Sequence, residues 1–303
     1  MSESPTFADP LNPPYLLGLF NQKIVVCGTV RNCGASLESD YLKIREALRR
    51  FTHVYWFLVE SDSEDNSINV LNEFSSKDTN FRYISLGMLA KDIPMRTDRI
   101  AYCRNRYLEE IAKFPEYADA PYLMVADLDG MQSLLTEDAF LSCFVDDDWD
   151  VLTSNQIGPY YDIWALRQEF WSPDDCWQHK AYLDQFKVGN GRSFFSAIYS
   201  RMINIPPSSP RIPVDSAFGG LAIYKTKVID ANTRYIGTNP DHQFRNGEVS
   251  EHVAFHQAIR SKGGKILINP KLINTGINQH SQKAIDALEV FEQLNQVHAA
   301  KNK

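Results

Sequence analysis

Two carboxylates spaced two residues apart, Asp127 and Asp129, follow a run of apolar residues at 122–126. A short apolar run of this kind predicts a buried parallel strand, and open α/β sheets bind ligands beyond the carboxyl ends of such strands. Carboxylate oxygens are the ligands that Mg²⁺ and Mn²⁺ prefer, commonly together with substrate phosphates. The spacing therefore indicates a metal-bridged diphosphate, although a surface turn rich in Asp and Gly would give the same pattern.

Three arginines, Arg96, Arg99 and Arg104, lie in or next to a segment with helical spacing at 97–114. A guanidinium can bind phosphate oxygens through two parallel hydrogen bonds, whereas an arginine on a solvent-facing helix needs no such role. The chain has a formal net charge of −7, so a negatively charged ligand would need local positive charge from arginine or from a metal ion. These arginines are therefore candidates for phosphate binding.

Strand-like and helix-like segments alternate along the chain, which predicts an α/β fold with a mainly parallel central sheet, helices on both faces and a single domain. A long aromatic segment at 160–195 interrupts the alternation, and such a segment is usually a binding loop or a small subdomain. The predicted strands are 23–27, 54–59, 81–86, 122–126, 150–153, 217–224 and 265–270, and the predicted helices are 37–51, 67–74, 97–114, 250–260 and 284–297.

Composition excludes several classes of protein. The net charge of −7, without a basic stripe, argues against nucleic acid as the main partner. The five cysteines are odd in number and scattered, which predicts neither a disulfide framework nor a zinc site and fits a cytoplasmic location. The first residues do not read as a signal peptide, and no apolar run is long enough to span a membrane. Peripheral attachment to a membrane stays open.

Several motifs, taken in order over residues 22–280, resemble those of glycosyltransferases of the GT-A fold. The finer details of 161–167 and 250–252 are most similar to fungal capsule-associated α-1,3-mannosyltransferases and their bacterial relatives. The motifs that carry the resemblance are the first strand and loop at 25–33, the acidic strand end at 57–67, the Arg-Asn-Arg at 104–106, the Asp-Leu-Asp at 127–129, the Phe-Gly-Gly at 218–220 and the Glu-His at 251–252.

For the first half of the chain the resemblance implies a site for a nucleotide-diphosphate sugar and a metal ion, Mn²⁺ or Mg²⁺. The metal ligands would be Asp127, Asp129 and a C-terminal histidine, His280. An exposed histidine without any role at this position is an equally good interpretation of His280. Glu60 and Asp62 would bind the ribose or the base, but a polar loop cap also accounts for them. The implied donor-binding residues are Thr29, Arg31, Asn32, Glu60, Asp62, Arg96, Arg104, Asp127 and Leu128.

For the second half the resemblance implies catalytic residues and an acceptor site. Glu251 and His252 stand where many family members have Glu-Asp, so the histidine puts a simple aspartate base in doubt, and Glu251 alone also suits a helix N-terminus. Aromatic rings stack on the C–H faces of sugars and carboxylates bind their hydroxyls, although Trp164 suits a core as well. The implied acceptor-binding residues are Tyr161, Asp162, Trp164, Gly219 and Gly220.

The resemblance implies a nucleotide-sugar-binding half at 21–150 and an acceptor-binding and catalytic half at 151–280. Pro and Ser content predicts an extended arm at 1–20, and an amphipathic pattern predicts a C-terminal helix within 281–303. The resemblance also implies transfer of a hexose to a saccharide or glycolipid acceptor during polysaccharide or glycan synthesis, with mannose and retention of configuration suggested. The oligomeric state is left undetermined.

Two other interpretations of Asp127-Leu-Asp129-Gly130 remain. In phosphatases of the haloacid dehalogenase type, Asp127 would be the nucleophile and Asp129 the acid/base. That motif normally opens its domain and needs a later acidic segment that this chain does not contain. A non-catalytic scaffold that binds nucleotide or glycan is the second alternative, and the intact Asp127, Asp129 and Glu251 count against it.

Overall fold

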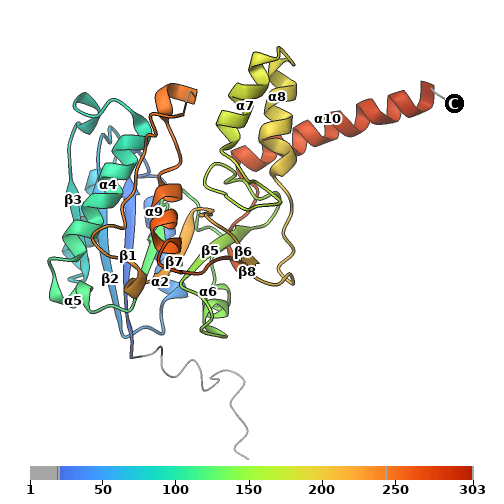
Figure 1. Ribbon diagram of the computed structural model, residues 1–303. Helices are drawn as coiled ribbons and strands as arrows, with labels where there is room; N and C mark the ends of the chain where they lie inside the picture. Colours follow the sequence, from blue (N-terminus) through green and yellow to red (C-terminus); the bar gives the residue numbers. More distant parts are fainter. Residues whose placement is uncertain (1–18, 20, 243, 302–303) are drawn as a thin grey trace, which may run out of the picture.

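Eight strands form one sheet in the order β3-β2-β1-β4-β7-β5-β8-β6, in a computed structural model that describes residues 19, 21–242 and 244–301 (Figure 1). The seven predicted strands occur close to their predicted positions, because apolar runs are stable when both faces of a strand are buried, whereas the two-residue β6 was not predicted. Their bounds are β1 (Lys23–Val30), β2 (His53–Glu60), β3 (Phe81–Ser85), β4 (Tyr122–Ala126), β5 (Val151–Gln156), β6 (Ile212–Pro213), β7 (Leu221–Lys225) and β8 (Ile266–Thr275).

Strand direction divides the sheet into two parts. β1 pairs in parallel with β2 and β4, β2 with β3, and β5 with β8, whereas β7 runs antiparallel between β4 and β5 and β6 runs antiparallel to β8. The predicted α/β fold with a mainly parallel sheet is therefore confirmed. The strand predicted at 217–224 begins only at Leu221, because Gly219 and Gly220 adopt φ values of +71° and +85° and form a turn.

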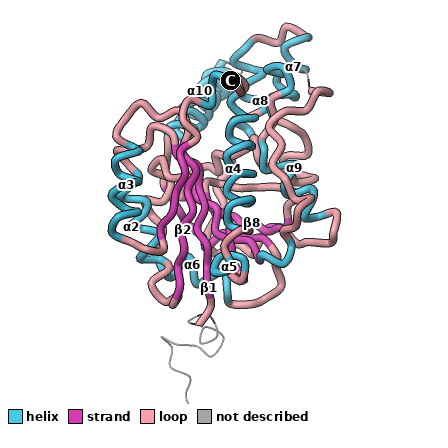
Figure 2. Tube along the Cα trace, turned by 90° about the vertical axis from the view of Figure 1, so that its left-hand side faces the viewer, coloured by secondary structure: helices cyan, strands magenta, loops and turns pink. Residues whose placement is uncertain are grey.

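Helices cover both faces of the sheet (Figure 2). One buried cluster joins the sheet to α4 and α9, and a second cluster on the opposite face joins it to α2, α3 and α6. The helices are α2 (Leu37–Ala47), α3 (Ser67–Lys77), α4 (Arg96–Ile111), α5 (Pro115–Ala118), α6 (Glu137–Leu141), α7 (Cys176–Gln185), α8 (Asn190–Ala197), α9 (Glu251–Arg260) and α10 (Gln279–Lys301), with 3₁₀ turns at Leu89–Lys91, Ser142–Phe144, Tyr199–Arg201, Thr226–Val228 and Phe244–Gly247.

The aromatic segment predicted as a loop or small subdomain contains a helical hairpin formed by α7 and α8, which stands beside the sheet (Figure 1). α10 passes close to this hairpin and then extends away from the rest of the molecule. It is longer than the predicted helix at 284–297 and places His280 in its first turn. The predicted arm at 1–20 lies outside the described residues, except for Leu19. Among the described helices, none is both long and apolar enough to cross a membrane.

Candidate functional site

A cavity of about 940 Å³ opens at the carboxyl ends of β1 and β4, where parallel sheets commonly bind ligands. The N-terminal half of α4, the first turns of α9 and α10, the loop after β5 and the α7–α8 hairpin complete its walls. All but four of the residues predicted for the site line this one cavity, although they come from segments far apart in the sequence. The four exceptions are Glu60, Asp62, Gly219 and Gly220.

The turn after β4 holds the two aspartates at the cavity floor. The backbone N–H of Asp127 donates to the Gly220 carbonyl (2.9 Å), and the Gln132 side-chain amide donates to the carbonyls of both residues (2.9 Å each). On α2, the buried Asp40 accepts from the backbone N–H groups of Gly130 (2.7 Å) and Gln132 (3.1 Å). Buried hydrogen bonds therefore fix the turn. Asp40 and Gln132, whose side chains form these bonds, were not among the predicted site residues.

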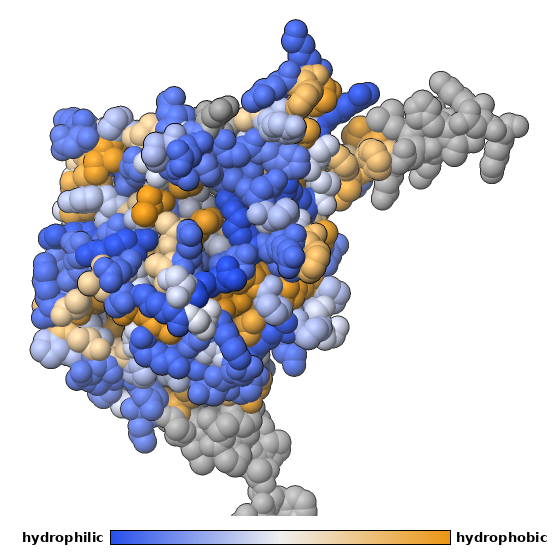
Figure 3. Space-filling model, in the orientation of Figure 1, coloured by the Kyte–Doolittle hydropathy of each residue, from blue (hydrophilic) through white to orange (hydrophobic). Residues whose placement is uncertain are grey.

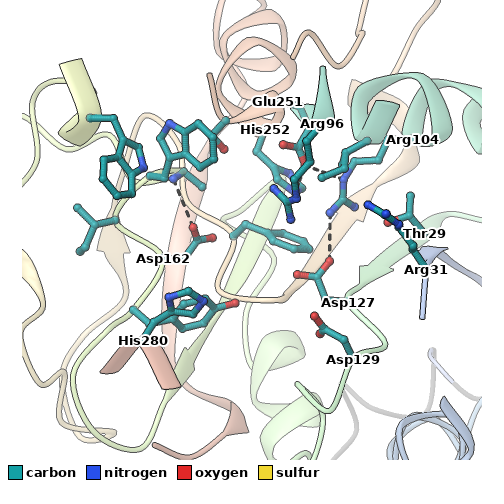
Figure 4. Close-up of a pocket in the computed structure, with 18 of the residues that line it drawn as sticks. Thr29, Arg31, Arg96, Arg104, Asp127, Asp129, Asp162, Glu251, His252 and His280 are labelled. Carbon is teal, nitrogen blue, oxygen red and sulfur yellow. Dashed lines mark hydrogen bonds and ion pairs between the residues drawn. The ribbon is translucent and has the colours of Figure 1, made fainter. Parts of the chain in front are cut away.

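Arg104, which is 3% exposed, joins carboxylates from the two halves of the chain. Its Nε donates to Glu251 Oε1 (2.8 Å) and its Nη2 donates to Asp127 Oδ1 (3.1 Å), as Figure 4 shows. The guanidinium carbon also lies 5.1 Å from the centroid of the Phe218 ring and 5.7 Å from that of Tyr235, within cation–π distance. Arg104 therefore sets the relative position of the two carboxylates.

Negative charge dominates the cavity floor around Asp127. The pKa of this carboxyl is raised to about 7, mainly by burial, with smaller contributions from Asp129, Glu251 and Asp162, while Arg104 lowers it. Arg104 pairs with Asp127 and Glu251, whereas Asp129 and Asp162, which also line the cavity, have no cationic partner within the described part of the chain. The floor is suited to a ligand or ion that brings positive charge or a proton.

Three cations on the rim provide positive charge for a ligand. Arg31, Arg96 and Lys283 line the cavity, and within the described part of the chain their side chains make no ion pair with a carboxylate. Arg99 differs, because it donates to two backbone carbonyls (2.9 and 2.7 Å) and its Nε lies 3.7 Å from Asp62 Oδ2. Lys283 was not predicted, because a lysine in an amphipathic tail helix has no distinguishing pattern.

The loop after β1 reaches the cavity through Thr29, Arg31 and Asn32. Asn32 adopts a left-handed φ of 51°, and its side-chain oxygen accepts from the Glu64 backbone N–H (2.7 Å). Its own N–H donates to Ser63 Oγ (3.1 Å). The loops after β1 and β2 therefore support each other, which accounts for a polar residue in a left-handed conformation.

The prediction that Glu60 and Asp62 face the ligand is not supported by their positions. Glu60 is 1% exposed and accepts hydrogen bonds from the Ser63 N–H (2.9 Å) and the Ser85 hydroxyl. Asp62 accepts from the Ala90 N–H (2.8 Å). Their carboxylates are used within the loop, as the loop-cap interpretation expected, and Ser61 between them lines the cavity instead.

The glycine pair supports the site from behind instead of lining it. The Gly219 N–H donates to Asp162 Oδ2 (3.0 Å), and its carbonyl accepts from Asn274 Nδ2 (2.8 Å) and Ser154 Oγ (2.9 Å). A Cβ on Gly219 would lie only 2.8 Å from the Ser154 hydroxyl oxygen. The predicted contact of these glycines with an acceptor is therefore replaced by a positioning role for Asp162, whose pKa is raised mainly by burial.

His252 is buried under the cavity wall as a neutral imidazole. Burial lowers its pKa well below the ordinary value, and Arg104 lowers it further. The ring stacks on Phe218 with centroids 3.8 Å apart, and Nε2 lies 3.6 Å from Glu251 Oε1, beyond hydrogen-bond distance. His252 can therefore offer a neutral hydrogen bond but not a positive charge.

Asp127 and Asp129 fit a divalent cation, whereas the three-ligand set with His280 is not assembled. Figure 4 shows both carboxylates at the cavity floor, with His280 on the opposite side. There His280 stacks on Tyr161 (centroids 6.1 Å apart). Within the residues that the structure describes, no three His, Cys, Asp or Glu side chains converge as a set of metal ligands. Two carboxylates of unbalanced charge suit a hard cation whose other ligands are waters and phosphate oxygens.

Two of the predicted residues line the cavity but mainly support it. Leu128 is 1% exposed and packs in the core between the two aspartates, so its side chain offers little to a donor. Trp164 donates its indole N–H to Asp175 (3.1 Å) while one side faces the cavity. The segment at 160–195 was predicted as a binding loop or small subdomain, but its residues beyond Trp164 were given no individual role in the site. The apolar wall beyond Trp164 comprises Cys176, Trp177, Phe194, Ile198, Tyr199 and Met202.

Comparisons with known proteins give structural likenesses at low identity. No family model and no curated protein matches the chain. Solved structures that it resembles are the mannosyltransferase PcManGT from Pyrobaculum calidifontis in complex with GDP-Man and Mn²⁺ (12% identity, TM-score 0.46, 84% of this chain) and S. aureus TarS 1-349 in complex with UDP-GlcNAc (12%, 0.47, 86%). A third is glucosyl-3-phosphoglycerate synthase from Mycobacterium tuberculosis in complex with UDP (9%, 0.42, 95%). The chain spans 56%, 61% and 85% of their respective lengths.

Proposed function

We propose that the protein is a glycosyltransferase that moves a hexose from a nucleotide-diphosphate sugar to a saccharide or glycolipid acceptor. The observation that carries this proposal is the arrangement around Arg104. One buried guanidinium holds Asp127 and Glu251 at the carboxyl edge of the sheet, with Asp162 across the cavity. This arrangement provides separate places for a leaving diphosphate, a reacting sugar and an acceptor hydroxyl.

The donor diphosphate is proposed to bind between the floor and the cationic rim. Arg31, Arg96 and Lys283 line the cavity without a carboxylate partner in the described part of the chain, so they are available for phosphate oxygens. Asp127 and Asp129 would hold a Mn²⁺ or Mg²⁺ ion, which when bound would neutralise the charge that develops on the leaving diphosphate. Thr29 and Asn32 are proposed to contact the nucleoside.

The chain's own groups are suited to the charges of glycosyl transfer. The bond to the diphosphate breaks with positive charge developing on the sugar, which nearby carboxylates stabilise. Glu251 is the proposed acceptor for the proton of the incoming hydroxyl, with Arg104 holding one of its oxygens. His252 has both ring nitrogens buried and stacks on Phe218, so it is proposed to position the charged groups beside it as a neutral side chain. Asp162, Tyr161 and Trp164 are proposed to bind the acceptor.

The sequence resemblance suggests mannose as the sugar, and synthesis of a polysaccharide or glycan as the setting. The phosphatase alternative fits the site less well. The phosphatase motif normally opens its domain, whereas Asp127 follows β4, the fourth strand of the sheet in chain order.

Nucleotide release tests the proposal. Purified protein is incubated with GDP-mannose, UDP-glucose, UDP-galactose, UDP-N-acetylglucosamine or GDP-fucose, with Mn²⁺ or with a chelator. We expect one donor to be turned over, with activity lost in chelator and reduced at least about 100-fold in Asp129→Asn. Asp138→Asn, an exposed carboxylate on α6 away from the cavity, is the matched control and keeps its activity.

Other outcomes separate the alternatives. Cleavage of p-nitrophenyl phosphate with no turnover of any nucleotide sugar supports the phosphatase. Tight binding of a nucleotide sugar without turnover, with or without sugar acceptors, supports the scaffold. Equal activity of wild type and Asp129→Asn would contradict the role given to the two-aspartate turn.

A further inference from the structure

The cavity extends beyond the proposed sugar site into an apolar compartment, which we call the aromatic compartment and define as Cys176 and Trp177 of α7, Phe194 and Ile198 at α8, and Tyr199 and Met202 after it. Its rings form a continuous array from the acceptor loop inwards. The centroids of Trp164 and Trp177 lie 6.4 Å apart, those of Trp177 and Phe194 5.6 Å, and those of Phe194 and Tyr199 6.0 Å. The array begins two residues from Asp162.

None of the six residues of the aromatic compartment carries a charge, and burial keeps the Cys176 thiol protonated by raising its pKa. The charged groups next to the compartment are used by other protein groups. Asp175 accepts from the Trp164 indole and from Arg167 Nη2 (2.8 Å), and it caps α7 through the N–H of Trp177 (2.9 Å). Further ion pairs at the hairpin join Arg201 with Asp174 (2.6 Å) and Lys180 with Asp184 (2.7 Å).

This lining is unsuited to a second sugar ring. A sugar site pairs an aromatic platform with several polar groups, because each buried hydroxyl without a partner costs free energy. Near the compartment the polar groups of Asp175, Arg201 and Lys180 already have protein partners. An apolar group, in contrast, would gain from leaving water at every ring that it touches.

We propose that the acceptor is an amphiphile, whose sugar lies at Asp162 and whose apolar aglycone, an alkyl or isoprenoid-like chain, fills the aromatic compartment. The role of this molecule as an acceptor rests on the proposed function, whereas its binding to the cavity is measurable without turnover. A charged or purely saccharide acceptor would leave the compartment unfilled.

Direct binding tests the proposal. Octyl and methyl glycosides of mannose, glucose and galactose are compared by calorimetry on the full chain, below the micelle concentration of the octyl compounds. Each methylene that becomes buried strengthens binding about fourfold. We therefore expect at least one sugar for which the octyl glycoside binds at least tenfold more tightly than the methyl glycoside. Equal affinities, or no binding of any octyl glycoside, would overturn the proposal.

Matched variants locate the octyl chain. Trp177→Ala and Phe194→Ala are expected to reduce the octyl preference at least fivefold, and either one suffices if the other does not fold. The face shown in Figure 3 is mostly hydrophilic but has hydrophobic residues on the hairpin, so binding to the outer surface needs a control. Phe186, which is 62% exposed, provides it. Loss of the preference in Phe186→Ala, with retention in Trp177→Ala, would place the chain outside the cavity and overturn the proposal.

Failure of this inference differs from failure of the proposed function. If a nucleotide sugar is turned over but octyl and methyl glycosides bind equally, the transferase stands and the amphiphilic acceptor falls. If octyl glycosides bind in the compartment but no nucleotide sugar is turned over or bound, the compartment stands and the transferase falls.

Discussion

The two walls of the cavity are built in different ways. The charged wall, centred on Arg104 with Asp127 and Glu251, stands on the ends of a strand and on two long helices, and backbone hydrogen bonds fix its turns. The aromatic wall stands on the α7–α8 hairpin and is held by ring contacts and surface-facing ion pairs. Polar chemistry is thus placed at the ends of the sheet and its covering helices, and apolar contacts are placed on the α7–α8 hairpin beside the sheet.

The largest effect is expected from removing the cation that unites the charged wall. Arg104→Met leaves Asp127 and Glu251 without their shared partner, and we expect the free energy of unfolding at pH 7 to fall by about 3 kcal/mol. Urea denaturation measures it. Arg106→Met on the same helix removes surface pairs with Glu109 and Glu110 and should cost at most about 0.5 kcal/mol. Equal losses would show that Arg104 does not hold the wall together.

A pH-dependent effect is expected from His256, which lies buried behind the charged wall between Ser216 Oγ and Tyr224 Oη (2.9 Å each). Burial lowers its pKa from 6.5 to about 3. Between these values the unfolded chain binds a proton that the folded chain does not, so this histidine reduces stability as pH falls, by about 1.4 kcal/mol per pH unit. When the pH falls from 7.5 to 5, the free energy of unfolding of His256→Gln should therefore decrease by about 2 kcal/mol less than that of the wild type, as measured by urea denaturation at each pH.

The control for this pH effect is His53→Gln, because His53 is exposed. Between pH 7.5 and 5, the free energy of unfolding of His53→Gln should decrease by the same amount as that of the wild type. Asp127 acts in the opposite direction, since its raised pKa of about 7 makes protonation favour the folded state as pH falls from 7 towards 4. Only the stability difference between His256→Gln and wild type isolates the effect of His256. If this difference is the same at pH 7.5 and at pH 5, the buried neutral state of His256 is contradicted.

A smaller effect compares a glycine of each region. Gly189 at the start of α8 and Gly219 beside the floor both have left-handed φ values, of +91° and +71°. A Cβ on Gly189 would meet nothing within 4 Å, whereas one on Gly219 would lie 2.8 Å from Ser154 Oγ. We expect Gly189→Ala to cost about 1 kcal/mol from backbone strain alone, and Gly219→Ala about 1 kcal/mol more. Thermal unfolding of both variants measures these losses of stability. A smaller loss for Gly219→Ala than for Gly189→Ala would contradict the close packing around Gly219.

The smallest effect is expected on the cationic rim. Arg96→Ala and Lys283→Ala each remove one exposed cation, so binding of GDP or UDP, whichever the wild type prefers, should weaken about fivefold at low salt and less at high salt. Calorimetry at two ionic strengths measures this. Lys271→Ala, an exposed lysine that does not line the cavity, should leave nucleotide affinity unchanged. If Lys271→Ala weakens nucleotide binding to the same extent, the effect comes from the overall charge of the protein and not from the position of Arg96 and Lys283 at the cavity.

Much of the charged wall follows from local patterns. The apolar run that ends at Asp127 predicted both the strand and its position at the ligand-binding edge, and helical spacing predicted the segment that carries Arg104. The structure differs from the predicted site where a polar residue had two possible partners. Glu60 and Asp62 accept hydrogen bonds from loop backbone, and Gly219 and Gly220 form a turn behind Asp162, so none of the four lines the cavity. The residue boundaries of the two halves and the metal role of His280 stay predictions.

The sequence by itself determined the α/β alternation and the strand-end carboxylates, because these depend on spacing and composition over short stretches. Only the tertiary structure decided that Arg104 meets Glu251, 147 residues away, and that Trp177 and Phe194 face the same cavity as Asp129. The physical reason is that a guanidinium or an aromatic ring has the same local pattern whether it faces water, core or ligand. Its partner is chosen by packing between elements that the chain brings together only when it folds.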